Sequence, residues 1–218
     1  MTHPAGTVGV CVQETGRYTA FTESMTGLQT PEGSMISFRY GTDIPNGMSW
    51  LADNMVGDWL FIMGDDHCFH PDLLMNLLDH EADVVVPLCL MRQRPFLPVV
   101  RVDDEGHVID LTQAATDGLV KIHSAGSAGM LIRKHVLDAV REKFPGPVFE
   151  RQADVSEDFL FCDRVRECGF NIRCDLGQTL GHMTATAIWP GKGPDEKWCI
   201  DFVVADSFQI QVAVARPE

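Results

Sequence analysis

Two adjacent carboxylates, Asp65 and Asp66, and the imidazole of His67 follow directly after the apolar run Trp59–Met63. A short apolar run bounded by turn residues is typical of a buried strand. Adjacent carboxylates at the end of such a strand are costly unless a positive group lies against them. A divalent cation carrying a polyphosphate is a common partner, because hard cations take oxygen ligands. The segment therefore predicts a metal site, although a turn whose polar side chains satisfy backbone groups would give the same pattern.

A second pair of carboxylates, Glu157 and Asp158, follows Ser156 at the start of an amphipathic segment. Acidic residues in a first helical turn are favoured by the helix dipole, so a purely structural role would explain this pair too. A functional role requires one carboxylate to face a pocket as a general base.

Two further motifs are weak when each is taken alone. His182 follows Gly181 after an apolar segment, and a lone histidine is more often structural than a ligand. The small residues from Gly126 to Gly129 would let the backbone approach a ligand closely, but glycine before a strand is frequent. The order and spacing of the four motifs carry more weight than any one of them.

Alternating short strands and helices must position these groups. Strands are expected at 7–13, 34–40, 59–63, 83–90, 130–133 and 171–176, and helices at 18–28, 48–55, from Pro71, at 135–144 and at 157–168. This alternation predicts an α/β/α sandwich around a mostly parallel, mixed central sheet. Such sheets bind ligands beyond the carboxyl ends of their strands.

Three other segments have a local prediction. Residues 43–47 are expected to form a loop, and residues 95–101 and 107–111 are expected to form a hairpin. Near the end of the chain, within residues 201–214, apolar side chains at every second position, Phe208, Ile210, Val212 and Val214, predict a late strand. That strand either closes the same domain or pairs with another subunit in a homo-oligomer.

The bulk composition limits the class of protein. A chain of 218 residues is long enough for one domain with a substantial core. The net charge of -14 argues against broad binding to a phosphate backbone, although a local basic groove could survive it. Its seven cysteines include no CxxC pair, which favours reduced core thiols over a zinc site. The chain has neither a membrane-length apolar run nor a secretory leader, so we expect a cytoplasmic protein.

The order of the motifs resembles that of the nucleotide-sugar-dependent glycosyltransferases of the GT-A fold, particularly the family 2-like group, over residues 8–182. The sequence from Gly64 to His67 resembles their DxD motif, and residues 126–133 resemble the glycine-containing strand that lines the donor and acceptor pocket. The Ser156-Glu157-Asp158 sequence resembles the xED motif. His182 matches the late histidine that often completes metal coordination.

This resemblance implies one glycosyltransferase domain over residues 1–218. Its nucleotide-sugar-binding half would span 7–90, its acceptor and catalytic half 91–190, and a C-terminal extension 191–218. The implied reaction moves a sugar from a nucleoside-diphosphate sugar, such as a UDP-sugar, to an acceptor hydroxyl with inversion.

The resemblance also assigns roles to residues. Asp66 would ligate Mn²⁺ or Mg²⁺ on the donor diphosphate, with His182 as a further ligand, and Asp65 would contact the ribose or support the metal. Gly64 stands where the first aspartate of the motif is expected. In the alternative register the motif reads DxH, and His67 becomes the ligand.

The same resemblance makes Asp158 the general base, with Glu157 helping to position the acceptor or the helix. The residues expected to line the donor site are Gln13, Glu14, Arg39, Asp43, Asp65, Gly126 and Gly129.

Two other functions stay open at this point. One is a nucleotidyltransferase with a related core, and the other is a nucleotide- or carbohydrate-binding module that has lost catalysis. The acceptor of a transferase could be a saccharide, a small molecule, a protein or a modified base in phage-type DNA. The acidic charge ranks DNA below a small or saccharide acceptor.

Overall fold

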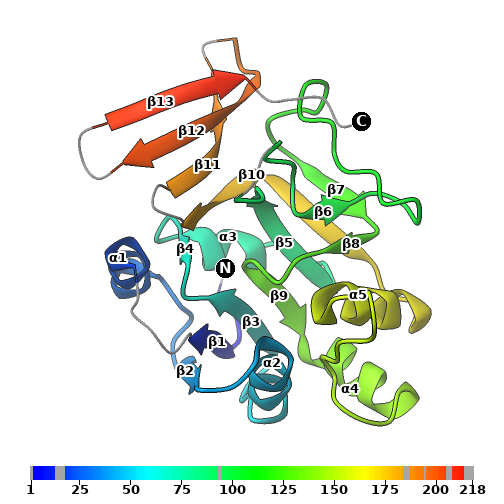
Figure 1. Ribbon diagram of the computed structural model, residues 1–218. Coiled ribbons are helices and arrows are strands. Elements are labelled where there is room, and N and C mark those ends of the chain that lie inside the picture. The colour runs from blue at the N-terminus through cyan, green and yellow to red at the C-terminus, as the bar shows by residue number, and fades with distance from the viewer. Residues whose placement is uncertain are drawn as a thin grey trace.

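A computed structural model describes residues 2–12, 18–92, 95–183, 187–193, 195–204 and 208–213, with side chains described up to Phe202. Most of the described strands join one sheet (Figure 1). Its order is β13 (Phe208–Ala213), β12 (Trp198–Val204), β11 (Ala187–Lys192), β10 (Ile172–Met183), β5 (Val84–Cys89), β9 (Met130–Arg133), β3 (Trp59–Gly64), β1 (Thr7–Val12) and β2 (Met35–Tyr40).

The sheet is mixed, as the sequence predicts. Strands β2, β1 and β3 are parallel to one another, and β10 is parallel to β5. Between β3 and β5 lies β9, which is antiparallel to both neighbours. Two short strands, β4 (His67–Cys68) and β7 (Leu119–Ile122), pair with β10, whereas β6 (Val100–Arg101) and β8 (Ser124–Ala125) form a separate pair.

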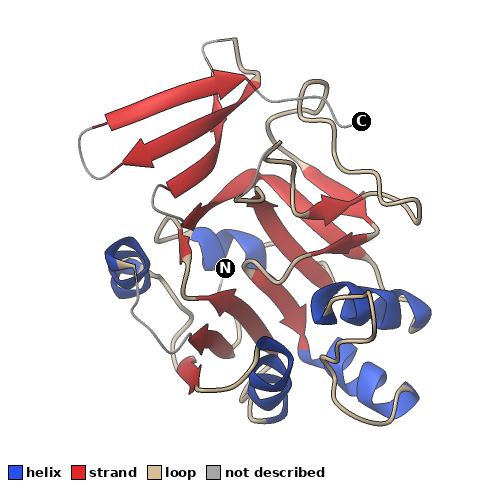
Figure 2. Cartoon of the chain, viewed as in Figure 1, coloured by secondary structure: helices blue, strands red, loops and turns tan. Residues whose placement is uncertain are grey.

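Helices cover both faces of the sheet (Figure 2). On one face α2 (Ile44–Asp53), α4 (Lys134–Lys143) and α5 (Glu157–Glu167) pack against side chains such as Leu60 and Ile62. On the other face α1 (Thr19–Gly27) and α3 (Leu73–Leu78) pack against Trp59, Phe61 and Met63. Successive residues of β3 thus alternate between two buried cores, as a strand covered on both faces requires. The predicted α/β/α sandwich is confirmed.

The strand directions bring the predicted motifs to one edge of the sheet. Because β1, β3, β5 and β10 run the same way, their carboxyl ends meet at the same edge. The antiparallel strand β9 starts at that edge, so the loop that contains Gly126 and Gly129 also lies there. The carboxylates that follow β3 therefore face this loop across the sheet edge.

Helix α2 begins earlier than the sequence pattern indicates. The expected loop at 43–47 is instead the first turn of this helix, which starts at Ile44. The Asp43 side chain accepts a hydrogen bond from the backbone N–H of Asn46 at 3.2 Å, and Pro45 stands in the first turn. Both are helix-start signals that override the weaker apolar periodicity of these residues. Helix α3 in turn begins at Leu73, two residues after Pro71.

Two strand predictions also change. The expected hairpin of 95–101 with 107–111 forms only at its tip, where an antiparallel bridge joins Arg101 to Val108 and the Val102 N–H donates to the His107 carbonyl at 2.7 Å. The ladder does not continue, because β6 pairs with β8. Strand β10 is twice as long as expected, because it continues past an irregularity between Asp175 and Thr179 as far as Met183.

The late strand is confirmed as β13, which pairs antiparallel with β12 of the same chain. The homo-oligomer expected through this segment stays a prediction. Among the described residues, no helix has the length and apolar character needed to cross a membrane.

Candidate functional site

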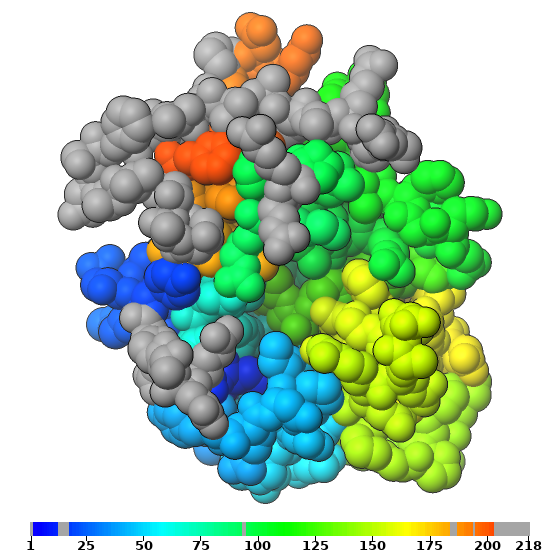
Figure 3. All heavy atoms as spheres, in the orientation of Figure 1, coloured from blue at the N-terminus to red at the C-terminus, as the bar shows by residue number. Residues whose placement is uncertain are grey.

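A pocket of about 260 Å³ lies at the carboxyl edge of the sheet, near the lower end of the range for ligand pockets. It opens between the start of α2 and the start of α5, on the face seen in Figure 3. Eight of the residues predicted from the sequence line it: Arg39, Asp43, Asp65, Asp66, His67, Gly126, Asp158 and His182.

Four predicted site residues are not among those that line the pocket. Gln13 and Glu14 lie outside the described residues. Gly129 has φ +68°, and a Cβ there would stand 3.0 Å from Pro87 Cγ and 3.1 Å from Leu180 Cδ1. The glycine serves the turn into β9 and the packing beneath it, and its role at the donor stays a prediction.

Glu157 is the fourth of these residues. It is buried, and Arg151 donates hydrogen bonds to its Oε2 from Nε at 3.1 Å and from Nη2 at 2.8 Å. Of the two predicted roles, positioning the helix fits this contact, and helping to position the acceptor stays a prediction.

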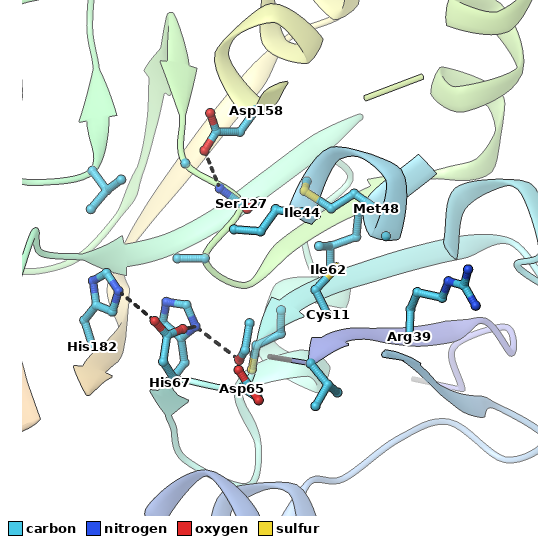
Figure 4. A pocket seen from close by; sticks show the side chains of 18 of the residues that line it. Cys11, Arg39, Ile44, Met48, Ile62, Asp65, His67, Ser127, Asp158 and His182 are labelled. Carbon is cyan, nitrogen blue, oxygen red and sulfur yellow. Dashed lines mark hydrogen bonds and ion pairs between the residues drawn. The ribbon is translucent and has the colours of Figure 1, made fainter. Parts of the chain in front are cut away.

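The two histidines of the pocket face each other across a short antiparallel ladder. Strand β4 pairs with the end of β10, so that His67 lies opposite His182 and Cys68 lies opposite Gly181. The two imidazole rings stack with their centroids 4.7 Å apart and an interplanar angle of 19° (Figure 4). A Cβ at Gly181 would stand 2.6 Å from Cys68 Sγ, so glycine lets the two strands approach.

Asp66 lies against both histidines. Its Oδ1 is 3.2 Å from His67 Nδ1, and its Oδ2 is 3.5 Å from His182 Nε2 and 3.0 Å from Arg92 Nη1. Burial alone would raise the pKa of this carboxyl group. Its contact with His182 and the charges of the neighbouring basic groups prevail and lower the pKa to about 2.

Gly64 makes this arrangement possible. A Cβ at this position would stand 2.8 Å from Asp66 Oδ1 and 3.3 Å from the His67 ring. An aspartate at position 64 would therefore displace the carboxylate that contacts the histidines. The groups that meet here are Asp66, His67 and His182, whereas the charge of Asp65 acts on the Cys11 thiol elsewhere in the pocket.

Both imidazoles are oriented by backbone carbonyls. The Nδ1 of His182 lies 2.9 Å from the carbonyl oxygen of Leu90, and the Nδ1 of His67 lies 3.2 Å from that of Gly64. Burial lowers the pKa of His67 to about 4, so this ring is neutral at neutral pH. Its Nε2 is buried and has no hydrogen-bond partner among the described residues. A neutral ring held through Nδ1–H with a free Nε2 is the form that binds metals.

Asp158 enters the same pocket from the other side (Figure 4). Its Oδ2 accepts a hydrogen bond from the backbone N–H of Ser127 at 3.3 Å, and its Oδ1 accepts from the N–H of Phe159 at 2.8 Å and from the hydroxyl of Ser156. Burial raises the pKa of this carboxyl group despite the hydrogen bonds. A Cβ at Gly126 would stand 3.4 Å from Asp158 Oδ2, so the glycine leaves this carboxylate room.

The third wall of the pocket is mostly apolar. Ile44 and Met48 from α2 and Cys11 from β1 line it, and burial raises the pKa of the Cys11 thiol to about 12. Arg39 places its guanidinium 5.0 Å from the centroid of the Trp50 ring. The Nε of Arg39 is buried without a hydrogen-bond partner among the described residues, so it offers a donor at this wall.

Sequence reasoning missed two residues of the site, Cys89 and Arg92. Cys89 ends β5 beside β10, and one ligand atom each of His67, Cys89 and His182 lie within 4.8 Å of one another. Only the strand order, which brings these residues together, could have revealed this. The structure also places Arg92, to which the sequence motifs give no role, against Asp66, with Nη1 3.0 Å from Oδ2.

Comparison with known proteins identifies a fold. No protein-family model matches the sequence, and no curated protein matches it. The crystal structure of A197 from STIV matches with a TM-score of 0.58 and 14% identity over 97% of both chains. The structure of GalNAc-T7 with UDP, GalNAc and Mn²⁺ matches with a TM-score of 0.55 and 11% identity, over 83% of this chain and 43% of that one. The chain has a GT-A-like fold.

Proposed function

We propose that this protein is a metal-dependent glycosyltransferase that moves a sugar from a nucleoside-diphosphate sugar, such as a UDP-sugar, to an acceptor hydroxyl with inversion. One observation carries the proposal: Asp66, His67 and His182 converge on one side of a pocket that Asp158 enters from the other. The similarity to GalNAc-T7, whose structure contains UDP, GalNAc and Mn²⁺, supports the same reaction class.

The side chains on the histidine side fit a divalent cation. A buried carboxylate that is ionised at neutral pH and two imidazoles oriented by carbonyl groups provide oxygen and nitrogen ligands. The unpartnered Nε2 of His67 independently indicates a missing ligand. A cation such as Mn²⁺ or Mg²⁺ held by Asp66, His67 and His182 would neutralise the charge that develops on the departing diphosphate.

Asp158 is the group that takes the proton of the acceptor hydroxyl in this proposal. Three hydrogen bonds, from Ser127, Phe159 and Ser156, fix the direction of its carboxylate. Its raised pKa makes it a stronger base than an exposed aspartate. Because the base and the histidine cluster lie on opposite sides of the pocket, a single displacement with inversion is the course that this geometry favours.

The remaining wall suits the nucleoside end of the donor. The apolar side chains of Ile44 and Met48 would cover a bound donor on this side, and their burial against it would limit hydrolysis. Arg39, held over Trp50, and Asp65 offer a donor and an acceptor for the polar groups of a nucleoside. Asp43 is engaged as the N-cap of α2, so a second role at the nucleotide would have to use its other carboxylate oxygen.

The proposal is tested by a thermal-shift screen of nucleotide sugars with a series of divalent cations, followed by assays of nucleoside-diphosphate release. A donor that binds the native state raises its melting temperature. We expect metal-dependent release with at least one donor, and loss of that release in Asp66→Ala with the fold retained. Asp138→Ala, an exposed carboxylate on α4, is the matched control.

Other outcomes would redirect the assignment. A shift without turnover would indicate a binding module, and release of pyrophosphate would indicate a nucleotidyltransferase. Full turnover in Asp66→Ala would overturn the metal centre. Saccharide, small-molecule, protein and modified-DNA acceptors are then compared with the donor that the screen identifies.

A further inference from the structure

A buried cysteine stands beside the histidine pair of the pocket. One ligand atom each of His67, Cys89 and His182 lie within 4.8 Å of one another. We propose that Cys89 is a thiolate ligand of this metal centre, and that the centre therefore takes Zn²⁺ in preference to Mg²⁺ or Mn²⁺. The inference rests on the proposed function in one respect: it concerns the metal centre that the proposed function places at Asp66, His67 and His182.

The strand order explains why the cysteine lies there. Cys89 is the register partner of Leu180 in the parallel pair of β5 and β10. Leu180 and His182 are two residues apart on one strand, so their side chains point to the same face. Cys89 and Leu180 share one buried core, which places the thiol on that face too. His67 then reaches the same point from β4, directly opposite His182.

The tautomers of the two imidazoles suit a metal rather than a plain hydrogen-bond network. Each ring has its Nδ1 at a backbone carbonyl oxygen, of Gly64 for His67 and of Leu90 for His182. In the neutral ring this leaves a lone pair on Nε2. The side chain of His67 is 7% exposed, and its Nε2 has no partner among the described residues. A buried polar atom without a partner is costly, and a metal ion would remove that cost.

The spacing of Asp66 and His182 also fits coordination. The distance from Asp66 Oδ2 to His182 Nε2 is 3.5 Å, which is long for a charge-assisted hydrogen bond. Two ligands that each lie about 2.1 Å from a tetrahedral Zn²⁺ are separated by about 3.4 Å. The observed separation therefore matches two ligands of one cation.

The set of donor atoms selects the metal. Two imidazole nitrogens with a thiolate sulfur suit Zn²⁺, whereas Mg²⁺ and Mn²⁺ favour carboxylate, carbonyl and water oxygens. With His67, Cys89 and His182 as protein ligands, the fourth tetrahedral position is left for Asp66 or for a donor phosphate oxygen, as in catalytic zinc sites.

Coordination displaces the proton of Cys89, which leaves with solvent as the sulfur–metal bond forms. The thiol now donates to the carbonyl oxygen of Leu90 at 3.7 Å. That oxygen still accepts the Nδ1–H of His182 after the thiol proton is lost.

Absorption spectroscopy of the full chain titrated anaerobically with Co²⁺, a spectroscopic substitute for Zn²⁺, tests the inference. We expect a sulfur-to-cobalt charge-transfer band in the near ultraviolet for the wild type, and displacement of Co²⁺ by Zn²⁺ but not by equimolar Mg²⁺. In Cys89→Ser the band should be absent and Zn²⁺ binding weaker by roughly tenfold or more. The exposed Asp103, Glu105 and His107 cluster contains no sulfur and cannot give the band.

Cys162→Ser is the matched control, because this thiol is also fully buried and also donates to a backbone carbonyl, at 3.6 Å from that of Ala125. The band should persist in this variant. X-ray absorption of the zinc-loaded wild type requires no variant and should detect sulfur at about 2.3 Å from the metal.

Three results would overturn the inference: cobalt binding without the band, a band that persists in Cys89→Ser, or a zinc shell without sulfur. None of them touches glycosyl transfer, which is read from nucleoside-diphosphate release. A sulfur-bound metal in a protein that turns over no donor would instead leave the inference intact and end the proposed function.

Discussion

Replacement of Asp158 by asparagine separates the proposed base from the fold that holds it. The amide keeps the size of the side chain and, with its oxygen at the Oδ1 position, still accepts from Phe159 N–H and from the Ser156 hydroxyl. It loses the acceptor for Ser127 N–H, now 3.3 Å from Oδ2. Loss of one such hydrogen bond costs about 1 kcal/mol of stability, and the removal of a buried charge offsets part of it. We expect the melting temperature to fall by roughly 2–4 °C at most.

The effect on the rate should be far larger. A positioned general base contributes roughly 10²–10⁴ in rate, and we expect kcat of Asp158→Asn to fall by that factor. At about 1.4 kcal/mol for each tenfold change, this is roughly 3–6 kcal/mol of transition-state stabilisation. Donor and metal binding should be unchanged, because Asp66 and the two histidines are untouched. Single-turnover transfer and calorimetric donor binding measure the two quantities separately.

The pH profile gives a second, independent measurement. Burial raises the pKa of Asp158, so the rate should rise with pH through an apparent pKa above the ordinary aspartate value of 3.8. This acid limb should disappear in Asp158→Asn. The control is Asp163→Asn, a more exposed carboxylate on the same helix. A wild-type rate in Asp158→Asn, or an unaltered acid limb, would refute the assignment of the base.

Three further substitutions test other parts of the structure. Gly64→Ala brings a Cβ to 2.8 Å from Asp66 Oδ1, so the rate of metal-dependent transfer should fall by up to about a hundredfold. An unchanged metal affinity in this variant would contradict the role given to the glycine. Ser49→Ala leaves the N–H and C=O of Phe149 without their buried partner, so urea denaturation should show a free energy of unfolding lower by about 1–3 kcal/mol. A smaller decrease would mean that water replaces the hydroxyl. Arg92→Ala removes a half-exposed guanidinium that would compete with a metal ion for Asp66. Calorimetry should therefore show divalent cations binding up to about fivefold more tightly and the donor binding more weakly. Weaker metal binding in this variant would be inconsistent with competition between Arg92 and the metal.

The layers of the fold were predictable because their signals are local. Each core strand of the sandwich is an apolar run between turn residues, and each helix has one apolar stripe. The strands that extend the sheet near the end of the chain were not predictable in this way. Strand β11 contains Pro190 and Gly191, which both argue against a strand, and it is held by long-range pairing with β12. Strand β4 has two residues, too few to show any period.

The site was predictable in its motifs but not in its geometry. The sequence named Asp66, His67 and His182 but left two registers of the metal motif open. The structure brings all three together because of a strand pairing that no local pattern encodes. The same pairing brings Cys89 into reach, although that residue is separated from both histidines by long stretches of chain. Sequence rules for zinc sites look for ligands at short spacings along the chain, whereas His67, Cys89 and His182 are close only in space.

The adjacent carboxylates at the end of β3 act separately, and this determines the kind of cation that the pocket suits. Two aspartates on one hard cation would give the centre two negative ligands. Here Asp66 contacts both histidines, and the charge of Asp65 adds to burial in raising the pKa of the Cys11 thiol on the apolar wall of the pocket. The imidazoles of His67 and His182 therefore stand where oxygen ligands would stand in a centre of the DxD type. A centre with one carboxylate, two imidazoles and a thiol within reach favours a borderline cation over a hard one, because nitrogen and sulfur form the stronger bonds to it.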